Sequence, residues 1–410
     1  MTAGTRRDPA PPRLPVDAAL VWSALLLAAF GLVMVSSASM PLADQRYGQP
    51  LFYFYRQLAF VGVGVVAGYA AYRIAPLALW RKLSPLAWPL AALLLVLVLV
   101  PGVGREVNGS SRWLVLGSVT VQASELVKLL AVVYLAGLLH RQQQAVASTT
   151  WGGIRPFVPL APLVVLILVE PDLGAAGVVG ATAAAMVFLA GMRLLPVLVT
   201  LSAAASTLAL ALYLSPYRLA RLAAFRDPWQ DPFGGGFQLV QSLIAIGRGG
   251  VAGVGLGDSV QKLFYLPEAH TDFILAVLAE ELGLLGVVAL IFLYGVLVWR
   301  CFAIAARCEA ARNIFAAQLC YGIGIWFGLQ ALINVGVNMG LLPTKGLTLP
   351  LVSYGGSSVT VMAMAVGLVA RVDAELKATQ ASRRRASRPA SRNSNQVPAR
   401  DAAEAPREAA

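Results

Sequence analysis

Ionisable side chains stand within or beside long apolar segments of this chain at three places. One apolar segment contains Glu125 and Lys128, a later one contains Glu280 and Glu281, and Asp272 immediately precedes the later one. A charged group near the centre of a bilayer costs at least about 2.5 kcal/mol, so such groups usually pair with one another or face a polar cavity. These three places are therefore where the sequence predicts chemistry.

Glu125 and Lys128 stand three residues apart, which places them on one face of a helix. The acidic residue is nearer the N-terminus, which is the favourable order for such a pair. One interpretation is a structural ion pair that holds this helix against its neighbours. The other is a lining for a substrate cavity, with Lys128 near a phosphate group.

Glu280 and Glu281 are adjacent in sequence, so the two side chains cannot both face lipid. Eight residues at about 100° each bring Glu280 to within roughly 80° of the direction of Asp272, whereas Glu281 points away. Glu280 is therefore the better candidate for the wall of a cavity. A hydrogen bond to a neighbouring span is the alternative for both residues.

Asp272 belongs to the stretch Leu-Pro-Glu-Ala-His-Thr-Asp-Phe at residues 266–273, which leads into an apolar segment. An aspartate directly before a helix is a good N-cap, and position alone favours this structural interpretation. A carboxylate at the outer mouth of a helix bundle, beside Glu268 and His270, could equally act as a general base. The two functions are compatible.

The segment before Asp272 is rich in cations, with Arg218, Arg221, Arg226, Arg248 and Lys262 among aromatic and glycine-rich stretches. Cations beside a lipid-facing groove suit a phosphorylated lipid. A solvated loop with incidental arginines is the alternative. Residues 238–246 are apolar but short, which indicates a re-entrant or interfacial segment. The glycines at 253, 255 and 257 lack the strand and helix of a dinucleotide site, so that function is excluded.

The composition predicts an all-α integral membrane protein. Of 410 residues, 58% are hydrophobic and 13% are charged, and the mean hydropathy is +0.72. An ordinary soluble domain is about half apolar and a quarter charged, and here the apolar residues form blocks of about 20, the length that crosses a bilayer. Ten spans are expected, at Ala18–Ser36, Phe52–Ile74, Leu86–Val100, Ala123–Leu139, Phe157–Val169, Leu173–Gly191, Leu194–Leu214, Phe273–Trp299, Ile314–Leu341 and Gly355–Ala370.

An even number of spans places both tails on one side of the membrane. Lys and Arg gather in the loops of that side, which predicts that both tails are cytoplasmic. Residues 215–271 then form a large extracytoplasmic loop between the seventh and eighth spans. We expect a short N-terminal tail at 1–17, a ten-span domain at 18–371 and a C-terminal tail at 372–410.

The net charge of +12 lies largely in the C-terminal tail, which is rich in Ala, Ser, Pro and Arg. This composition predicts disorder. A basic cluster beside a membrane is attracted to anionic headgroups, so no nucleic-acid partner is expected, and docking to a cytoplasmic protein is the alternative. Three cysteines indicate no disulfide framework. The small residues Ser36, Ser37 and Ala38 leave a cleavable signal peptide as an alternative to the first span.

Several long motifs, in order, make the chain resemble the SEDS family (shape, elongation, division, sporulation) from about Ala18 to Arg371. Ala123 stands where the family usually has proline. Ala269, the Thr-Leu-Pro at 348–350 and the long tail resemble the cell-division members more than the elongation members. The motifs lie at Asn108–Trp113, Gln122–Lys128, Glu170–Gly174, Leu266–Ile274, Ala279–Gly283, Pro343–Pro350 and Ser353–Ser358.

The resemblance implies a peptidoglycan glycosyltransferase that polymerises lipid II, an undecaprenyl-diphosphate disaccharide-pentapeptide, at the division septum of the inner (cytoplasmic) membrane. It assigns Asp272 as the catalytic carboxylate. The residues expected to bind the leaving diphosphate are, in order of preference, Lys345, Arg218 and Lys128. The other expected substrate-binding residues are Glu125, Glu280, His270 and Arg248.

The resemblance also implies a divalent cation (Mg²⁺ or Mn²⁺), for which no dedicated metal site is visible. The implied partners are a class B penicillin-binding transpeptidase and other division proteins.

Two rival functions are a lipid II flippase and a non-catalytic scaffold that recruits the transpeptidase. Charges within spans and helices broken by Gly or Pro suit a transport path. A flippase, however, needs a polar lining through the whole depth of the membrane, whereas a polymerase needs one outward cluster with a base and cations. The charges named above favour the outer half, which supports the enzyme.

Overall fold

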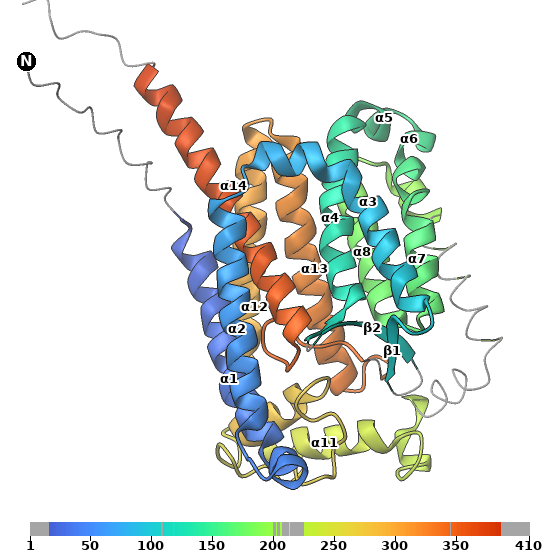
Figure 1. Cartoon of the computed structure of the whole chain (residues 1–410), viewed down its shortest axis with the longest axis vertical. Helices are drawn as coiled ribbons and strands as arrows, with labels where there is room; N and C mark the ends of the chain where they lie inside the picture. Colours follow the sequence, from blue (N-terminus) through green and yellow to red (C-terminus); the bar gives the residue numbers. More distant parts are fainter. Residues whose placement is uncertain are drawn as a thin grey trace, which may run out of the picture.

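Long helices run side by side as a bundle in the computed structural model of the chain (Figure 1). The structure describes residues 16–107, 110–117, 119–199, 202, 206, 213, 225–344 and 346–386. The helices along the bundle are α1 (Ala18–Tyr47), α2 (Phe52–Arg73), α3 (Leu77–Leu99), α4 (Ala123–Arg141), α7 (Leu160–Val169), α8 (Leu173–Leu189), α12 (Ile274–Ala310), α13 (Ile314–Asn338) and α14 (Gly356–Ala386). Short helices are α5 (Gln143–Ser148), α6 (Thr150–Ile154), η1 (Arg155–Phe157), η2 (Pro228–Gln230) and α11 (Phe237–Gly249).

The prediction of an all-α membrane protein is confirmed. Over the described residues, seven helices are long and apolar enough to cross a membrane, and α8 is a shorter apolar helix. Nine of the ten predicted spans contain a helix of the bundle. The predicted span 194–214 lies mostly outside the described residues, so the number ten is not confirmed.

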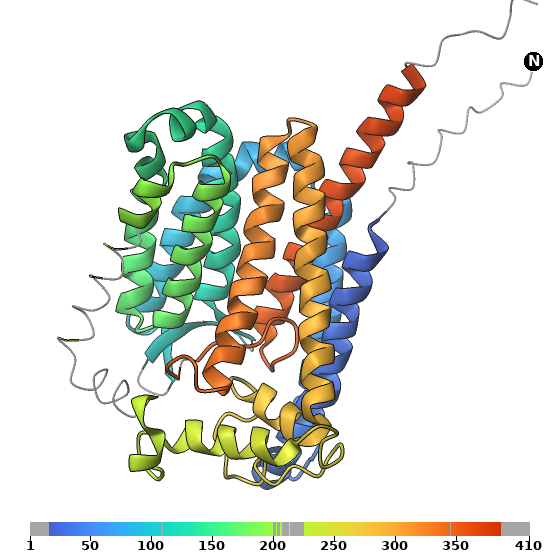
Figure 2. The ribbon, with the colours of Figure 1, turned by 180° about the vertical axis from the view of Figure 1, so that it is seen from behind.

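The two ends of the bundle differ. Helix α1 begins, and α14 ends, at the end that carries α5 and α6, which we call the α5–α6 end (Figure 1). Helix α11 lies crosswise over the opposite end of the bundle, which we call the α11 end (Figure 2). The short apolar segment 238–246 therefore does not cross the bundle from end to end, which agrees with the prediction that it is not a span.

A three-stranded antiparallel sheet, which was not predicted, covers part of the α11 end. Strands β1 (Gly104–Val107), β2 (Ser110–Leu116) and β3 (Val119–Gln122) pair in that order. Leu114 is buried against Val98 and Ala123 at the ends of α3 and α4. The strands are short and local, with β-branched residues on either side of a turn at Gly117. Strands this short lack the long apolar blocks by which the sequence indicates membrane spans.

Helix α12 differs from the predicted span Phe273–Trp299 in length and continuity. It extends to Ala310, and its backbone leaves the helical conformation at Gly283, where φ is 65° and ψ is −162°. Such a left-handed φ suits a residue without a Cβ atom. The residues before Gly283 thus form a separate short helix, Ile274–Leu282, directly after Asp272.

The predicted disordered tail from residue 372 is wrong for its first part. Helix α14 continues to Ala386, and Asp373 is fully buried in it. The Asp373 carboxylate pairs with Arg307 of α12 at 2.9 Å and with Lys377 at 2.6 Å. Arg307 and Lys377 thus pair with the buried carboxylate of Asp373. Composition alone does not reveal such contacts, so it predicts disorder for this segment. The rest of the predicted tail lies outside the described residues.

Glycines allow α2 and α14 to approach closely. A Cβ atom on Gly68 of α2 would lie 2.6 Å from the carbonyl oxygen of Ala363 in α14, and one on Gly367 would collide with the carbonyl of Gly68. Small residues at such an interface let two helix backbones meet where no water is available to drive packing.

We therefore expect Gly68→Leu to separate α2 from α14 and to lower the thermal unfolding temperature of the purified protein in detergent. Overpacking a close contact costs about 1–3 kcal/mol. The matched control is Gly62→Leu on the same helix, where a Cβ atom meets nothing within 4 Å. Equal unfolding temperatures for the two variants would contradict the close packing.

Candidate active site

Asp272 does not cap the helix that follows it, so the structural interpretation favoured by its position is wrong. Helix α12 begins at Ile274, and its N-cap position, Phe273, makes no side-chain cap bond. The amide of Ala276 in the first turn instead donates to Oδ1 of Asn338 on α13 at 3.2 Å. Because α13 supplies this acceptor, the Asp272 carboxylate is not used by the helix.

The main chain of Asp272 is held firmly even though its carboxylate is not. Its carbonyl oxygen accepts from Nδ2 of Asn334 at 2.9 Å and from Nδ2 of Asn338 at 3.1 Å. Both asparagines are buried. Among the described residues, no group donates a hydrogen bond to the Asp272 carboxylate. The side chain is partly exposed, so it can accept from a bound molecule.

The loop between α13 and α14 packs against the Asp272 segment. The hydroxyl of Ser353 donates to the carbonyl of Thr271 at 2.6 Å, and the amide of Tyr354 donates to the carbonyl of His270 at 3.0 Å. A Cβ atom on Gly346 would lie 3.1 Å from Oδ2 of Asp272. The motif around residues 343–358 and the motif around Asp272 therefore form one wall of the same site.

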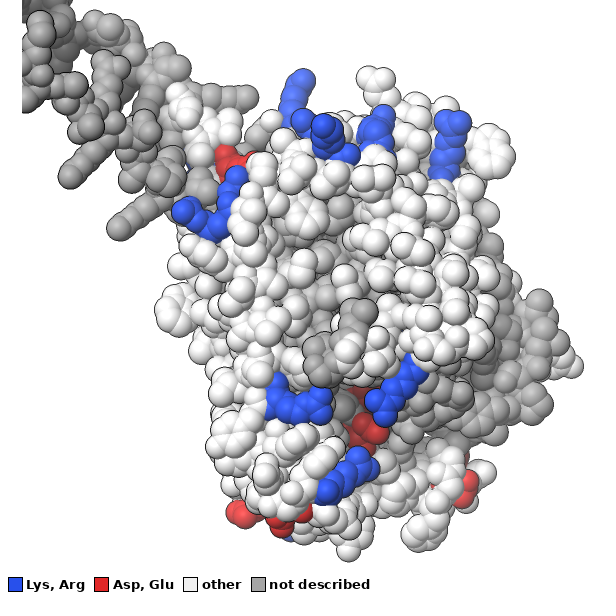
Figure 3. Space-filling view, in the orientation of Figure 1, with Lys and Arg blue, Asp and Glu red and all other residues white. Residues whose placement is uncertain are grey.

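Charged groups around Asp272 tune its protonation. Burial, together with the carboxylates of Glu268 and Asp172, raises the pKa of Asp272 to about 7, and the guanidinium of Arg112 opposes this rise. Figure 3 shows acidic side chains in a hollow flanked by basic ones on this half of the molecule. A carboxyl group with a pKa near neutrality is half ionised at pH 7 and suits proton transfer.

Arg112 on β2 is held at the site by main-chain oxygens. Its Nε donates to the carbonyl of Glu170 at 3.1 Å and its Nη2 to the carbonyl of Pro171 at 2.6 Å. In the described part of the chain it forms no ion pair with a carboxylate. Its positive charge is therefore not neutralised, and its remaining N–H groups can bind an anion.

Glu170, in the turn between α7 and α8, is 1% exposed, and neither carboxyl oxygen has a hydrogen-bond partner within the described chain. Burial and the nearby carboxylate of Asp172 raise the pKa of Glu170 to about 8, and the guanidinium of Arg112 opposes this rise. Glu170 is thus mainly neutral at pH 7, so its side chain does not neutralise the positive charge of Arg112.

His270 lies in an aromatic cluster rather than in the open hollow. Its ring centroid is 4.9 Å from that of Tyr53 and 5.5 Å from that of Tyr354. Burial lowers its pKa, and the nearby Glu268 only partly opposes this. The packed imidazole supports the loop before Asp272.

The sequence model of the family described as Cell cycle protein, which covers FtsW, RodA and SpoVE, matches residues 18–378. The chain belongs to this family. The membership predicted from the motifs is thereby confirmed.

Curated members of the family are similar over nearly the whole chain. A protein of Thioalkalivibrio sulfidiphilus is 54% identical over 360 residues, which cover 88% of this chain and 90% of that protein. One of Coxiella burnetii is 49% identical over 356 residues, 87% of this chain and 95% of that protein. Both are named probable peptidoglycan glycosyltransferase FtsW.

Solved structures of the family share the fold. A chain from work on coordinated polymerization and crosslinking by a peptidoglycan synthase complex has a TM-score of 0.73 and 35% identity, covering 89% of this chain and 99% of that one. The crystal structure of the rod shape determining protein RodA of Thermus thermophilus has a TM-score of 0.66 and 31% identity, covering 88% and 98%.

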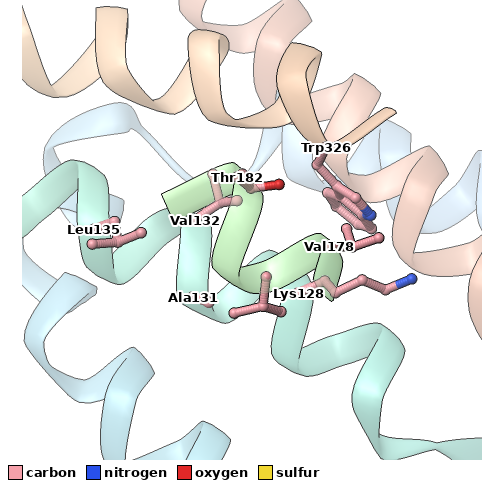
Figure 4. Close-up of a pocket in the computed structure, with 8 residues that line it drawn as sticks. Lys128, Ala131, Val132, Leu135, Val178, Thr182 and Trp326 are labelled. Carbon is pink, nitrogen blue, oxygen red and sulfur yellow. The ribbon is translucent and has the colours of Figure 1, made fainter. Parts of the chain in front are cut away.

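Two of the predicted substrate-binding residues of this family member form a buried ion pair. Nζ of Lys128 lies 2.8 Å from Glu125 and donates to Oε1 of Gln330 at 2.7 Å. The cavity beside Lys128 measures about 10 Å³, the room of one water molecule. Figure 4 shows the stem of Lys128 along this cavity, with the amino group turned in the same direction as the indole nitrogen of Trp326.

The other predicted residues have mixed outcomes. Glu280 is fully buried and accepts from Arg248 at 3.0 Å. The two side chains therefore lie together, with Arg248 partly exposed and Glu280 away from the surface. Glu281 is fully buried, pairs with Lys262 at 2.8 Å and accepts from Ser37 of α1 at 2.6 Å. The alternative of a hydrogen bond to a neighbouring span is therefore confirmed for Glu281. Lys345 and Arg218 lie outside the described residues.

Sequence reasoning missed several residues that build the site. Arg112, Glu170 and Asp172 were noted only as parts of motifs, and Asn334 and Asn338 were not noted. A signal for the asparagines was present, since costly amide side chains recur every four residues along an apolar span.

Asn338→Leu should leave the carbonyl of Asp272 with Asn334 as its donor and the amide of Ala276 with only its bond to the carbonyl of Phe273 at 3.0 Å. Each lost hydrogen bond should cost about 0.5–1.5 kcal/mol. Hydrogen exchange read by mass spectrometry should show faster exchange at the start of α12. Asn334→Leu is the matched control, because Asn334 bonds Asp272 but not Ala276. Equally fast exchange at Ala276 in both variants would contradict the cap from α13.

Proposed function

We propose that this chain is a peptidoglycan glycosyltransferase that polymerises lipid II into glycan strands during septal cell-wall synthesis. The observation that carries the proposal is the state of Asp272. Its main chain is fixed by α13, its carboxylate has no hydrogen-bond donor among the described residues, and its pKa lies near 7 beside the uncompensated charge of Arg112. The names of the relatives support the same activity.

The reaction joins two lipid-linked sugars. Asp272 takes the proton of the 4-hydroxyl of an acceptor GlcNAc while that oxygen forms a bond to the anomeric carbon of a donor MurNAc. The bond between this carbon and the diphosphate breaks, and the electron pair leaves with the undecaprenyl diphosphate. Attack from the face opposite the leaving group turns the α-linked diphosphate into a β-1,4 glycoside.

Positive charge at the diphosphate stabilises its departure. Arg112 suits this function, because it is oriented by two carbonyls and its charge is free. Lys345 and Arg218 remain proposals from the resemblance. Lys128 is less suitable, since it is buried and already bonded to Glu125 and Gln330.

A divalent cation is part of the proposal only as a companion of the substrate. In the described part of the chain, no group of three or more His, Cys, Asp or Glu side chains could hold a metal ion. We therefore propose that Mg²⁺ or Mn²⁺ enters bound to the diphosphate, and no step is assigned to it.

The orientation of the chain in the membrane and its protein partners are part of the same proposal. The start of α1 and the end of α14 lie at one end of the bundle (Figure 1), and basic side chains gather on that end (Figure 3). This arrangement supports cytoplasmic tails and an extracytoplasmic α11 end in the inner membrane. We propose a class B penicillin-binding transpeptidase and other divisome proteins as partners.

The rival functions have less support. A flippase requires a polar path across the bilayer, but the intramembrane pair of Glu125 and Lys128 is buried, and the cavity beside it holds one water molecule and is lined mainly by apolar residues. A scaffold requires no carboxyl group with a tuned pKa.

Asp272→Asn should abolish polymerisation of lipid II by the protein purified with its transpeptidase. The variant should keep the wild-type unfolding temperature and still bind its partner, because Asn334 and Asn338 bond to the main-chain carbonyl of residue 272 and not to its side chain. A flipping assay in proteoliposomes runs beside it. Polymerisation at the wild-type rate would remove the catalytic assignment, and loss of flipping alone would favour the transporter.

The pH profile of kcat/KM should have an acid limb near pH 7, because protonation removes the base form of Asp272. Glu268→Gln removes a negative charge that raises this pKa, so the limb should move to lower pH. Arg112→Gln removes a positive charge that lowers the pKa, so the limb should move to higher pH. Shifts in the same direction, or no shift in either variant, would contradict the assignment.

A further inference from the structure

The short helix Ile274–Leu282 is attached to the rest of α12 only through Gly283, where the helix is interrupted. An interruption leaves main-chain donors and acceptors without their partners four residues away. In an apolar environment these groups need partners from elsewhere in the protein.

The missing partners come from the segment that follows α11. We call residues 249–262 the brace. Its amides of Val254 and Gly255 donate to the carbonyls of Glu280 and Glu281 at 3.0 and 3.1 Å. Across the break, the amides of Leu284 and Leu285 donate to the carbonyls of Gly250 and Val251 of the brace at 3.0 and 3.2 Å. The brace therefore bonds both parts of α12.

Glycines make this contact possible. A Cβ atom on Gly283 would lie 2.5 Å from the carbonyl oxygen of Val251, and one on Gly253 would collide with the carbonyl of Glu281. A Cβ atom on Gly249 would collide with the carbonyl of Ala279. The backbones of brace and helix are closer than any side chain permits.

The two acidic side chains at the end of the short helix hold the brace on two sides. Glu280 accepts from the amides of Val260 and Gln261 at 3.1 and 3.3 Å, from the hydroxyl of Ser259 and from Arg248 at 3.0 Å. With four donors, Glu280 is occupied by the protein itself.

Glu281 connects the brace to α1. Lys262 Nζ and Ser37 Oγ donate to Oε1 of Glu281 at 2.8 and 2.6 Å, and Lys262 Nζ also donates to Ser37 Oγ at 2.9 Å. Ser37 belongs to α1, and all three side chains are almost completely buried. The short helix is thus fixed at its start by Asn338 and at its end by the brace and α1.

We propose that Glu280 and Glu281 are positioning residues, which act through the brace to set the place of Asp272 relative to Arg112 and the acceptor hydroxyl. The inference rests on the proposed function of Asp272. Because the short helix is separate from the membrane-spanning part of α12, its orientation is not determined by that span. The brace determines it. This differs from the substrate-binding function expected for Glu280 and Arg248.

The test uses the full chain with its transpeptidase and measures polymerisation of lipid II by Glu280→Gln, Glu281→Gln and Lys262→Met. We expect kcat to fall at least tenfold with KM for lipid II changed less than threefold, because the base is misplaced while the substrate surface remains. The acid limb of the pH profile should also shift, since the surroundings of Asp272 change. Lys262→Arg, which keeps the ion pair, should restore kcat.

Glu309→Gln is the matched control, because Glu309 is on α12 at the α5–α6 end, where it accepts from the hydroxyl of Tyr321. Its kinetic constants should equal those of the wild type. Should Glu281→Gln fail to fold, Lys262→Met carries the test, since it leaves Glu281 bonded to Ser37.

The proposal is overturned if folded Glu281→Gln and Lys262→Met keep the wild-type kcat and pH limb. It is also overturned if their defect is confined to KM, which would make these residues substrate-binding. Asp272→Asn is assayed in parallel. If it is inactive while the brace variants behave as wild type, only the brace is refuted, whereas an active Asp272→Asn refutes the proposed function itself.

Discussion

The site depends on amide side chains of α13 that satisfy main-chain groups inside an apolar bundle. Gln330, Asn334 and Asn338 recur every four residues and so share one face of the helix. Gln330 donates to the carbonyl of Thr348 at 2.9 Å and accepts from Lys128, while the two asparagines bind the carbonyl of Asp272. One helix face thereby joins α4, the loop before α14 and the start of α12. Without water to replace them, these bonds are costly to lose.

This arrangement has a chemical consequence. A carboxylate next to a helix start normally bonds to the free amides there, which would lower its pKa. Since Asn338 takes that position for Ala276, the Asp272 carboxylate stays available and burial raises its pKa to about 7. Arg112 is held by carbonyls rather than by a carboxylate, so its charge remains available to an anion. Over the part of the chain that the structure describes, neither the Asp272 carboxylate nor the Arg112 guanidinium forms an ion pair.

The fold could be predicted from the sequence where one physical property dominates. Long apolar blocks led directly to the bundle, because a bilayer admits helices and little else. The short sheet, the interruption at Gly283 and the helical continuation past residue 372 were not predicted. Each depends on a distant partner: α3 and α4 for Leu114, the brace for Gly283 and Arg307 of α12 for Asp373.

The charged residues show the same division. Their rarity in apolar segments marked Glu125, Lys128, Glu280 and Glu281 as important, but spacing alone could not say what each one contacts. Helical geometry relates Glu280 to Asp272 only if Asp272 belongs to the helix, but α12 begins at Ile274. Four donors then occupy Glu280, and Lys262 with Ser37 occupies Glu281.

The sequence by itself determined that this protein is a helical membrane protein of its family and that Asp272 stands at the mouth of a helix. These properties follow from local composition and from motifs, which need no knowledge of distant contacts. Only the tertiary structure decided that the Asp272 carboxylate accepts no hydrogen bond from the described residues, whereas Lys128 is bonded to Glu125 and Gln330. The reason is that the chemical behaviour of a buried polar group depends on its hydrogen-bond partners. Asn338 and Gln330, which contact the start of α12 and Lys128, both come from α13.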